Sequence, residues 1–326
     1  MKAIVYTQYG SPDVLRLEEV AKPTPKPDQV LVKVHAASIN AADSLFLKGE
    51  SAMVRLMAGG LNRPKCTILG SDVAGIVESV GAAVTRFKPG DAVLGDLSNA
   101  GFGGLAEYVA MPETYLTLKP EAVRFEDAAA IPLAGVTAIQ GVRDKGQVQA
   151  GQQVLIYGAS GGVGVYLVQI AKAYGAEVTA VCSTGKVEMV RGLGADHVID
   201  YMKDDFLQSG QQYDVILAAN GYRPITDYQR AVKPGGAYVM VGGKMTQIFQ
   251  AMLLGPILSM TSNKKMTNLM AKANAQDLAV LAEMLATGKL KPIIDQCYPL
   301  SQAADAFRYL VQGHARGKVV IRVTEK

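Results

Sequence analysis

Residues 153–164 read QVLIYGASGGVG, and this stretch decides the fold of the second half of the chain. Gln153–Tyr157 is a short apolar run typical of a buried strand, and Val163–Tyr174 continues with apolar residues at helical spacing. The glycines of Gly158–Gly164 predict a tight turn that brings backbone N–H groups to the start of that helix. A second strand, Glu177–Val181, then completes the order of a dinucleotide-binding unit, although a plain strand-to-helix turn is the alternative.

The glycine spacing in this turn is G-x-x-G-x-x-G rather than the more common G-x-G-x-x-G. The residues that we expect along the pyrophosphate of the dinucleotide are Gly158, Ser160, Gly161, Gly162, Val163 and Gly164.

The residues after the second strand select the dinucleotide. A carboxylate there would accept hydrogen bonds from the ribose of NAD and repel a 2′-phosphate. This chain has no acid there and instead reads Cys182-Ser183-Thr184-Gly185-Lys186. Two hydroxyls and a cation favour NADP(H), with Ser183, Thr184 and Lys186 as ligands. The alternative for Lys186 is a solvated lysine at a helix start.

Alternation of strands and helices continues after the glycine turn and predicts a parallel sheet with helices on both faces. The expected strands are His197–Ile199, Asp214–Ala218, Tyr228–Val232 and Ala237–Val241, and the expected helices are Lys186–Leu193 and Asp277–Thr287. The first ~120 residues instead read as short strands between Gly and Pro, typical of a β-rich domain. These strands are Ala3–Tyr6, Val30–Val34, Asp72–Val80 and Asp91–Leu94. They are followed by a helix over Glu126–Gln140 that Pro132 and Gly135 interrupt. Mixed strands return after Pro292 and end in Lys318–Val323.

Composition narrows the class of protein. With 326 residues the chain is long enough for two domains, and its net charge of +4 without a basic tract gives no case for nucleic acid or an anionic membrane. Three separated cysteines, Cys66, Cys182 and Cys297, make a disulfide framework improbable and favour a reducing, cytoplasmic compartment. The start lacks the pattern of a signal peptide, and the apolar stretch 248–260 is too short to span a bilayer. We interpret that stretch as buried or ligand-covering.

Several further motifs together give a family resemblance along essentially the whole chain. They are Ser38–Asn40 (SIN), Leu69–Val77 (LGSDVAGIV), Lys88–Asp91 (KPGD), Gly103–Tyr108 (GGLAEY), Leu193–Tyr201 (LGADHVIDY) and Gly313–Val320 (GHARGKVV), besides the glycine turn. With these motifs in this order, the chain resembles the zinc-free quinone oxidoreductase, or ζ-crystallin-like, branch of the medium-chain dehydrogenase/reductase superfamily.

The resemblance implies an α/β fold of two domains. A GroES-like β-barrel catalytic domain would comprise residues 1–120 and 290–326, and a Rossmann doubly wound parallel sheet domain would comprise residues 121–289. The active site of the family lies in the cleft between the domains, where pockets commonly form.

The resemblance also implies that the protein binds no metal. Zinc-dependent members carry a catalytic Cys and a Gly-His-Glu in the first domain, and four closely spaced cysteines elsewhere. Here the matching positions are Asn40 and Gly70-Ser71-Asp72. The three cysteines cannot form a four-thiolate cluster, and His35, His197 and His314 have no ligand spacing.

Catalytic roles follow from the same resemblance. Asn40 matches a family Asn near the nicotinamide and is the candidate donor to the substrate carbonyl oxygen. Asp43 is the second candidate, with a helix cap as its alternative. Some quinone reductases of this branch carry a Tyr two residues beyond that Asp, and here the position is Leu45, with the nearby Phe46 unable to donate a hydrogen bond.

Further cofactor contacts are implied at strand ends and in the closing motif. Thr137 would approach the nicotinamide side, and Tyr201 would lie near the 2′-phosphate and adenine. The remaining expected contacts are Asn220, Gly221, Gly242, Gly243 and Lys318, and the alternatives are ordinary loop glycines and a solvated lysine.

The expected activity is NADPH-dependent hydride transfer to a quinone without zinc. Two alternatives stay open: an enone or 2-alkenal C=C reductase, and an inert NADPH-binding, crystallin-like protein. The resemblance also implies a homodimer, because relatives of this type pair the outer strands of their Rossmann sheets. Lys265–Ala271 alternates as such an edge, and pairing it would also protect an open apolar edge from aggregation.

Overall fold

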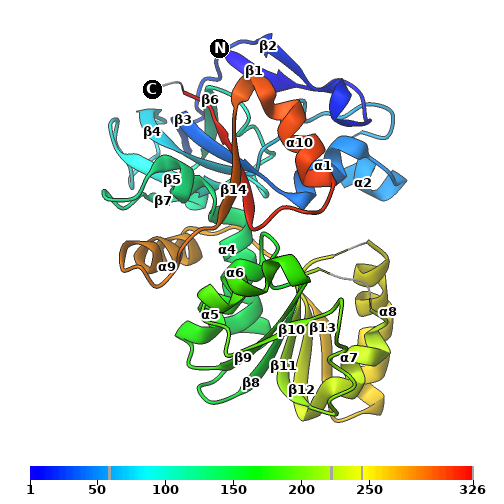
Figure 1. The fold of residues 1–326 in the computed structure, drawn as a ribbon. Coiled ribbons are helices and arrows are strands. Elements are labelled where there is room, and N and C mark those ends of the chain that lie inside the picture. Colours follow the sequence, from blue (N-terminus) through cyan, green and yellow to red (C-terminus); the bar gives the residue numbers. More distant parts are fainter. Residues whose placement is uncertain (58–59, 221–222, 244, 325–326) are drawn as a thin grey trace. The chain divides into compact units, whose positions relative to one another are not determined.

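The computed structural model describes residues 1–57, 60–220, 223–243 and 245–324, which form two compact units (Figure 1). The first unit contains Met1–Leu133 and Lys272–Lys326, and the second contains Ala134–Ala271. The first unit is thus larger than the sequence predicted. Helix α3 (Phe125–Ala129) packs on strands of this unit, and so does α9 (Ala275–Ala286).

The first unit is built on antiparallel strands. Its strands are β1 (Lys2–Val5), β2 (Arg16–Glu19), β3 (Gln29–Ile39), β4 (Asp72–Val80), β5 (Ala92–Asp96), β6 (Tyr108–Pro112), β7 (Leu116–Leu118), β14 (Ile294–Pro299) and β15 (Lys318–Arg322). Its other helices are α1 (Ala41–Lys48), α2 (Ala52–Met57) and α10 (Ala303–Val311), with short 3₁₀ turns at Pro12–Val14, Glu113–Tyr115 and Leu300–Gln302.

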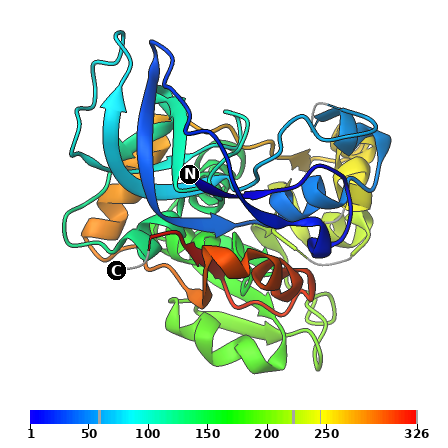
Figure 2. The ribbon, with the colours of Figure 1, turned by 90° about the horizontal axis from the view of Figure 1, so that it is seen from above.

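A seven-stranded sheet forms the centre of this unit, in the order β14-β15-β3-β4-β5-β7, with β6 also paired to β3. The long strands β3 and β4 run side by side (Figure 2). The last strand, β15, pairs antiparallel with β3, with Val319 opposite Ile39. The predicted return of the C-terminal segment to the first domain is therefore confirmed, and it brings the start of β15 beside the end of β3.

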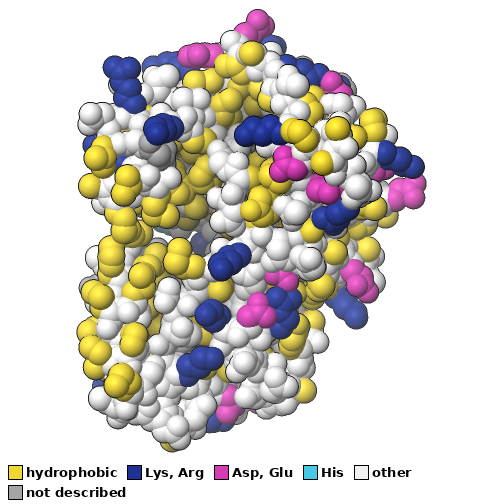
Figure 3. All heavy atoms as spheres, turned by 180° about the vertical axis from the view of Figure 1, so that it is seen from behind, with side chains coloured by type: hydrophobic (Ala, Val, Ile, Leu, Met, Phe, Trp, Pro, Cys, Tyr) yellow, Lys and Arg dark blue, Asp and Glu magenta, His cyan; other side chains and the backbone are white. Residues whose placement is uncertain are grey.

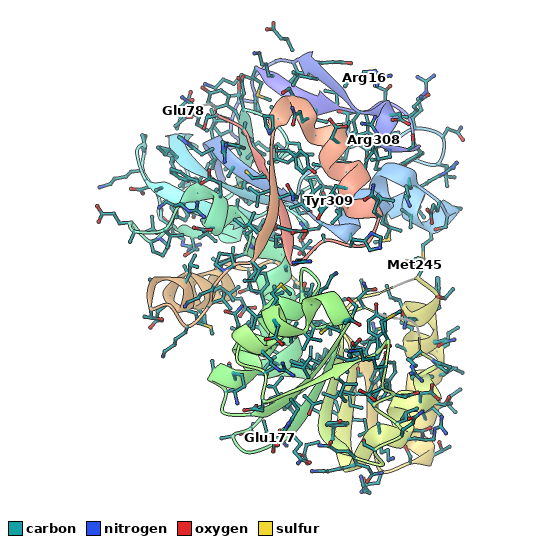
Figure 4. The ribbon with its side chains drawn as sticks, viewed as in Figure 1. Arg16, Glu78, Glu177, Met245, Arg308 and Tyr309 are labelled. Atoms are coloured by element: carbon teal, nitrogen blue, oxygen red, sulfur yellow. The ribbon has the colours of Figure 1, made fainter. Side chains whose placement is uncertain are left out.

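Apolar alternation explains how the sheet is packed. Val30, Val32 and Val34 of β3 are fully buried, as expected for one face of a pleated strand. Helix α10 packs Phe307 into the same core. On its outer side Arg308 projects from α10 (Figure 4) and pairs with Asp13 of the first 3₁₀ turn.

The second unit is a parallel six-stranded sheet with helices. Its strands are β8 (Gln153–Tyr157), β9 (Glu177–Cys182), β10 (His197–Asp200), β11 (Tyr213–Ala218), β12 (Val232–Met240) and β13 (Lys265–Asn268). Its helices are α5 (Gly164–Ala173), α6 (Val187–Gly192), α7 (Ile225–Ala231) and α8 (Met245–Thr261), with a π-helical turn at Gln140–Lys145 and a 3₁₀ turn at Thr184–Lys186. Helix α4 (Pro132–Ile139) carries the chain from the first unit into the second.

The strand order β10-β9-β8-β11-β12-β13 is that of a Rossmann doubly wound sheet. All five pairings are parallel. The order reverses between β8 and β11, so the carboxyl ends of these two strands mark the position where such sheets bind dinucleotides.

One predicted strand was wrong. The strand expected over Tyr228–Val232 is largely helical, because Ile225–Ala231 forms α7. The Tyr228 ring of this helix stacks on Tyr238 of β12, with centroids 4.8 Å apart. The helix expected over Glu126–Gln140, interrupted at Pro132 and Gly135, is two helices, α3 and α4. Pro132 is the first residue of α4, and Gly135 lies within that helix.

Residues 248–260, expected to be buried or to cover a ligand, lie in α8, and much of this helix is not buried. It begins at Met245 (labelled in Figure 4) and leaves large apolar side chains exposed, with Leu253 69%, Ile257 56% and Met260 88% accessible. Figure 3 shows hydrophobic side chains gathered along the left edge of the second unit. None of the described helices combines the length and apolar character needed to cross a bilayer.

Candidate active site

The glycine turn lies between β8 and α5, as predicted. Gly158 has φ of +81°, which favours glycine, and a Cβ on Gly164 would lie 2.2 Å from the Gly158 carbonyl oxygen. At Gly161 the situation is opposite, because a Cβ there would meet only that same oxygen, at 3.6 Å. The space beside Gly161 at the start of α5 therefore fits the close approach of a pyrophosphate to backbone N–H groups.

Other predicted cofactor residues lie at the same edge of the sheet. The Ala219 N–H donates to the Tyr157 carbonyl at 2.9 Å, and the Gly242 N–H donates to the Ala218 carbonyl at 3.2 Å. The ends of β8, β11 and β12 are thus adjacent, and they bring Gly158, Asn220 and Gly242 together. Gly243 follows with φ of +136°.

The other predicted cofactor residues in this part of the chain have different surroundings. Ser160 of the turn and Thr137 of α4 are both buried. Gly162 and Val163 complete the turn before α5 and are partly exposed. Gly221 lies outside the described residues.

The predicted 2′-phosphate ligands come from the ends of two neighbouring strands. The Tyr201 N–H donates to the Cys182 carbonyl at 3.0 Å, which places Tyr201 beside the segment Ser183–Lys186. One residue in this region was missed, namely Asp200, whose carboxylate accepts the Thr184 hydroxyl at 2.6 Å. That hydrogen bond lowers the pKa of Asp200. The hydroxyl proton of Thr184 is therefore used inside the protein, while Tyr201 is half exposed.

In the first unit, a buried polar cluster surrounds Asn40, the residue that precedes α1. The Lys318 ammonium forms an ion pair with Asp72 at 3.1 Å, and the two side chains are 2% and 0% exposed. Lys318 also donates to the amide oxygen of Asn40. Sequence reasoning expected Lys318 at the cofactor, and the structure instead places its ammonium in this ion pair. We call Lys318, Asp72, Asn40 and Ser38 the Lys318 network.

Asp72 holds this network together. Its Oδ2 accepts from the Ser38 hydroxyl at 2.6 Å and from the Asn40 amide Nδ2 at 3.0 Å, in addition to Lys318. Its Oδ1 accepts from the Leu133 backbone N–H at 2.7 Å. The carboxylate is thus saturated by donors from β3, α4 and β15. Such satisfaction is what permits a buried charge.

The network fixes which way the Asn40 amide points. An ammonium only donates and an ionised carboxylate only accepts, so the Asn40 oxygen must face Lys318 and the nitrogen must face Asp72. One Nδ2 hydrogen is used by Asp72. The second has no protein partner among the described residues, and Asn40 is partly exposed. This amide can therefore donate one hydrogen bond to a ligand.

Asp43 is a helix cap and a support for the neighbouring loop. It is fully buried and accepts from the Asn40 backbone N–H at 2.8 Å, from the Gly70 N–H at 3.0 Å and from the Ser71 hydroxyl at 3.3 Å. Burial raises the pKa of Asp43 to about 6, although the backbone donors oppose the shift. These contacts make Asp43 a positioning residue rather than a group that faces a substrate.

Asp96 was not anticipated from the sequence. It lies opposite Asp72 in the pairing of β5 with β4 and is 0% exposed. Its Oδ1 accepts from the Ser98 N–H at 2.8 Å, whereas its Oδ2 has no partner among the described residues. Burial, with the nearby Asp72 charge, raises the pKa of Asp96 to about 7. The available signal was an acid at the end of an apolar strand.

The donor set gives no support for a resident metal. Among the described residues, no group of three or more His, Cys, Asp or Glu side chains has a metal-holding arrangement. Cys66, Cys182 and Cys297 are free thiols.

Comparison with known proteins identifies the family. Residues 26–121 match the alcohol dehydrogenase GroES-like domain, and residues 193–321 match the model described as zinc-binding dehydrogenase. The chain is 40% identical to 2-methylene-furan-3-one reductase of Solanum lycopersicum, over 98% of this chain and 79% of that protein. It is 39% identical to the NADPH-dependent alkenal/one oxidoreductase of Arabidopsis thaliana chloroplasts, with the same two coverages.

The fold comparison agrees with the sequence comparison. The quinone oxidoreductase from Coxiella burnetii superposes with a TM-score of 0.89 at 30% identity, covering 99% of each chain. The first unit is therefore the GroES-like domain and the second the Rossmann domain of an NAD(P)H-dependent oxidoreductase of the quinone/alkenal reductase type. The chain is an enzyme that belongs to the zinc-free quinone oxidoreductase branch of the medium-chain dehydrogenase/reductase superfamily.

Proposed function

We propose that this enzyme uses NADPH to reduce an electron-poor quinone, or the C=C bond of an α,β-unsaturated carbonyl compound, without a metal. The observation that carries the proposal is the Asn40 amide, which the Lys318 network orients with one hydrogen still able to bind a ligand. The bound nicotinamide supplies the hydride. The protein must then stabilise the negative charge that develops on the carbonyl oxygen of the acceptor.

Asn40 is suited to that task. An amide donor that is already oriented stabilises a developing oxyanion without reorganisation in the transition state. Quinones and enones both delocalise the incoming charge onto a carbonyl oxygen, so a neutral donor can replace the Lewis acid that alcohol oxidation requires. Dialysis against a chelator should therefore leave the activity intact, and stoichiometric zinc in elemental analysis would contradict a metal-free enzyme.

The preference for NADPH rests on the ends of β9 and β10. Ser183 is the first residue after β9, so that position carries no carboxylate. Tyr201 is the first residue after the neighbouring strand β10. The carboxylate that is close, Asp200, is bound by the Thr184 hydroxyl and the Met202 N–H. A 2′-phosphate would thus meet the hydroxyls of Ser183 and Tyr201, with Lys186 in the same segment as Ser183.

Reduction of an enone has support of its own. The relatives at 40% and 39% identity are named for a methylene-furanone and for alkenals and alkenones, whereas the superposed structure is named for quinones. We infer that both acceptor classes are substrates, since both need the same donor at Asn40.

The test is the turnover of Asn40→Ala with NADPH and the best acceptor. Removing one oxyanion donor should lower kcat by about 10²–10³-fold, while the dissociation constant of NADPH changes little. Asn274→Ala is the matched control, because the Asn274 side chain caps α9 through Asp277. That variant should lose stability but keep kcat. Wild-type kcat in Asn40→Ala would refute the assigned role.

A further inference from the structure

We propose that Lys318 is a positioning residue for catalysis, whose ammonium fixes the Asn40 amide so that its Nδ2 faces the substrate. This proposal rests on the function proposed above for Asn40. It also replaces the expectation that Lys318 binds the dinucleotide.

The first argument is the geometry at the start of β15. Lys318 is the first residue of this strand and donates to both Asn40 and Asp72. Lys318 is the charged donor to the Asn40 Oδ1, and the capping box of α1 brings the neutral Asp43 backbone N–H to the same side chain. Without the ammonium, the Asn40 amide loses its one charge-assisted hydrogen bond at the oxygen, so its Nδ2 is held less firmly in the position that serves a developing oxyanion.

The second argument is burial. A side chain that is 2% exposed and paired with a 0% exposed carboxylate would have to abandon that ion pair to reach a phosphate. Leaving Asp72 buried and unpaired is strongly unfavourable. Two further buried carboxyls, Asp43 on α1 and Asp96 on β5, are close enough to Asp72 and Lys318 to influence one another electrostatically. Lys318 is therefore held in place by its ion pair with Asp72 and its hydrogen bond to Asn40.

The test separates positioning from cofactor binding with Lys318→Met, which keeps the length of the side chain and removes the ammonium. We expect kcat to fall by about tenfold to a hundredfold, the loss typical of a misplaced catalytic group. We expect the KM for the acceptor and the dissociation constant of NADPH, measured by fluorescence titration, to stay within about twofold of wild type. A weaker NADPH complex with an unchanged kcat would show instead that Lys318 binds the cofactor.

A second variant keeps the proposal testable if Lys318→Met does not fold. The double variant Lys318→Met with Asp72→Asn removes both charges, so no unpaired carboxylate stays buried. If Lys318 serves only to neutralise Asp72, this variant recovers the wild-type kcat. If Lys318 positions Asn40, folding is recovered while kcat stays low.

The matched control is Lys233→Met. Lys233 pairs with Asp214 at 3.0 Å in the second unit, and its loss should leave kcat unchanged. The two proposals fail in different ways. A wild-type enzyme that reduces no quinone or enone would refute the proposed function. An active wild type whose kcat survives Lys318→Met would refute only the role of Lys318.

Discussion

Three carboxyls, those of Asp43, Asp72 and Asp96, are buried in the first unit, and Asp72 pairs with Lys318, the one buried lysine among the described residues. One cation cannot offset three negative charges in a medium of low polarity, so the folded state favours protonation of the carboxyls with fewer donors. Asp72 has four donors, one of which is the Lys318 ammonium of the ion pair, whereas Asp96 has an oxygen without a partner among the described residues. Asp96 is therefore the group that holds a proton most readily.

Stability should consequently depend on pH in a defined direction. The pKa of Asp96 is about 7 in the folded protein, against an ordinary value of 3.8, so the folded state binds a proton more tightly than the unfolded chain. This contribution is full below about pH 4 and is lost as the pH rises through about 7. Asp43, with its pKa of about 6, acts in the same direction.

Asp96→Asn tests this dependence, because an amide cannot ionise. Between pH 5 and pH 8, wild type should lose about 1–3 kcal/mol more unfolding free energy than the variant does. Denaturant titrations at both pH values measure the difference. A variant whose pH dependence matches wild type between these values would show that Asp96 does not titrate there.

Cofactor preference is also decided by single residues. Ser183→Asp would place a carboxylate directly after β9, where it would repel a 2′-phosphate and accept hydrogen bonds from a ribose. We expect NADPH to bind about tenfold to a hundredfold more weakly, the value of a charge-assisted contact, and NADH to bind more tightly. Fluorescence titration with both cofactors measures this. Ser209→Asp, on an exposed loop of the same unit, controls for added charge, and an unchanged preference in Ser183→Asp would contradict the assignment.

The turn between β8 and α5 contains two glycines, Gly164 and Gly161, that are required for different physical reasons. Gly164→Ala would bring a Cβ within 2.2 Å of a backbone oxygen, so we expect a lower melting temperature. Gly161→Ala meets no such clash, so it should fold normally and bind NADPH at least about tenfold more weakly.

Gly192→Ala is the control for this pair, because a Cβ there meets nothing within 4 Å. It should alter neither the melting temperature nor the NADPH affinity. Thermal unfolding and fluorescence titration distinguish the three variants. Normal NADPH binding by Gly161→Ala would mean that the pyrophosphate does not approach this turn.

Some of these elements and site residues could be predicted from the sequence alone, and others could not. Parallel strands and the glycine turn were predictable, since their apolar runs and glycines are local signals. Asn40 and Asp43 were found through the family motif, and the capping role of Asp43 was one of the two alternatives. The Lys318 network was not predictable, because Lys318, Asp72 and Asn40 are brought together only by the pairing of β15 and β4 with β3.

For the whole molecule, the exposed surface of the second unit indicates where a second copy of the chain would bind. β13 is the edge strand that the sequence predicted, paired only with β12. However, the Met266 N–H already donates to the Ser259 hydroxyl of α8 at 2.8 Å, so α8 covers part of this edge. The exposed apolar side chains of α8 are then the surface that a second copy would bury.

We expect light scattering to give twice the chain mass of 34.5 kDa. The double variant Leu253→Glu with Ile257→Glu places charges on the exposed face of α8 and should lower the mass to that of one chain. Val280→Glu on α9, which is 40% exposed in the first unit, is the control and should stay dimeric. A wild-type protein of single-chain mass at micromolar concentration would contradict the dimer.

We propose above all that this enzyme moves a hydride from NADPH to acceptors that place charge on a carbonyl oxygen. The most direct measurement is a panel of kcat/KM values with NADPH for quinones, 2-alkenals and enones, set beside the oxidation of simple alcohols with NADP⁺. We expect kcat/KM for quinones or enones to far exceed kcat/KM for alcohol oxidation. We also expect it to stay unchanged after treatment with a chelator. Alcohols as the best substrates, or no turnover of any quinone or enone, would contradict it.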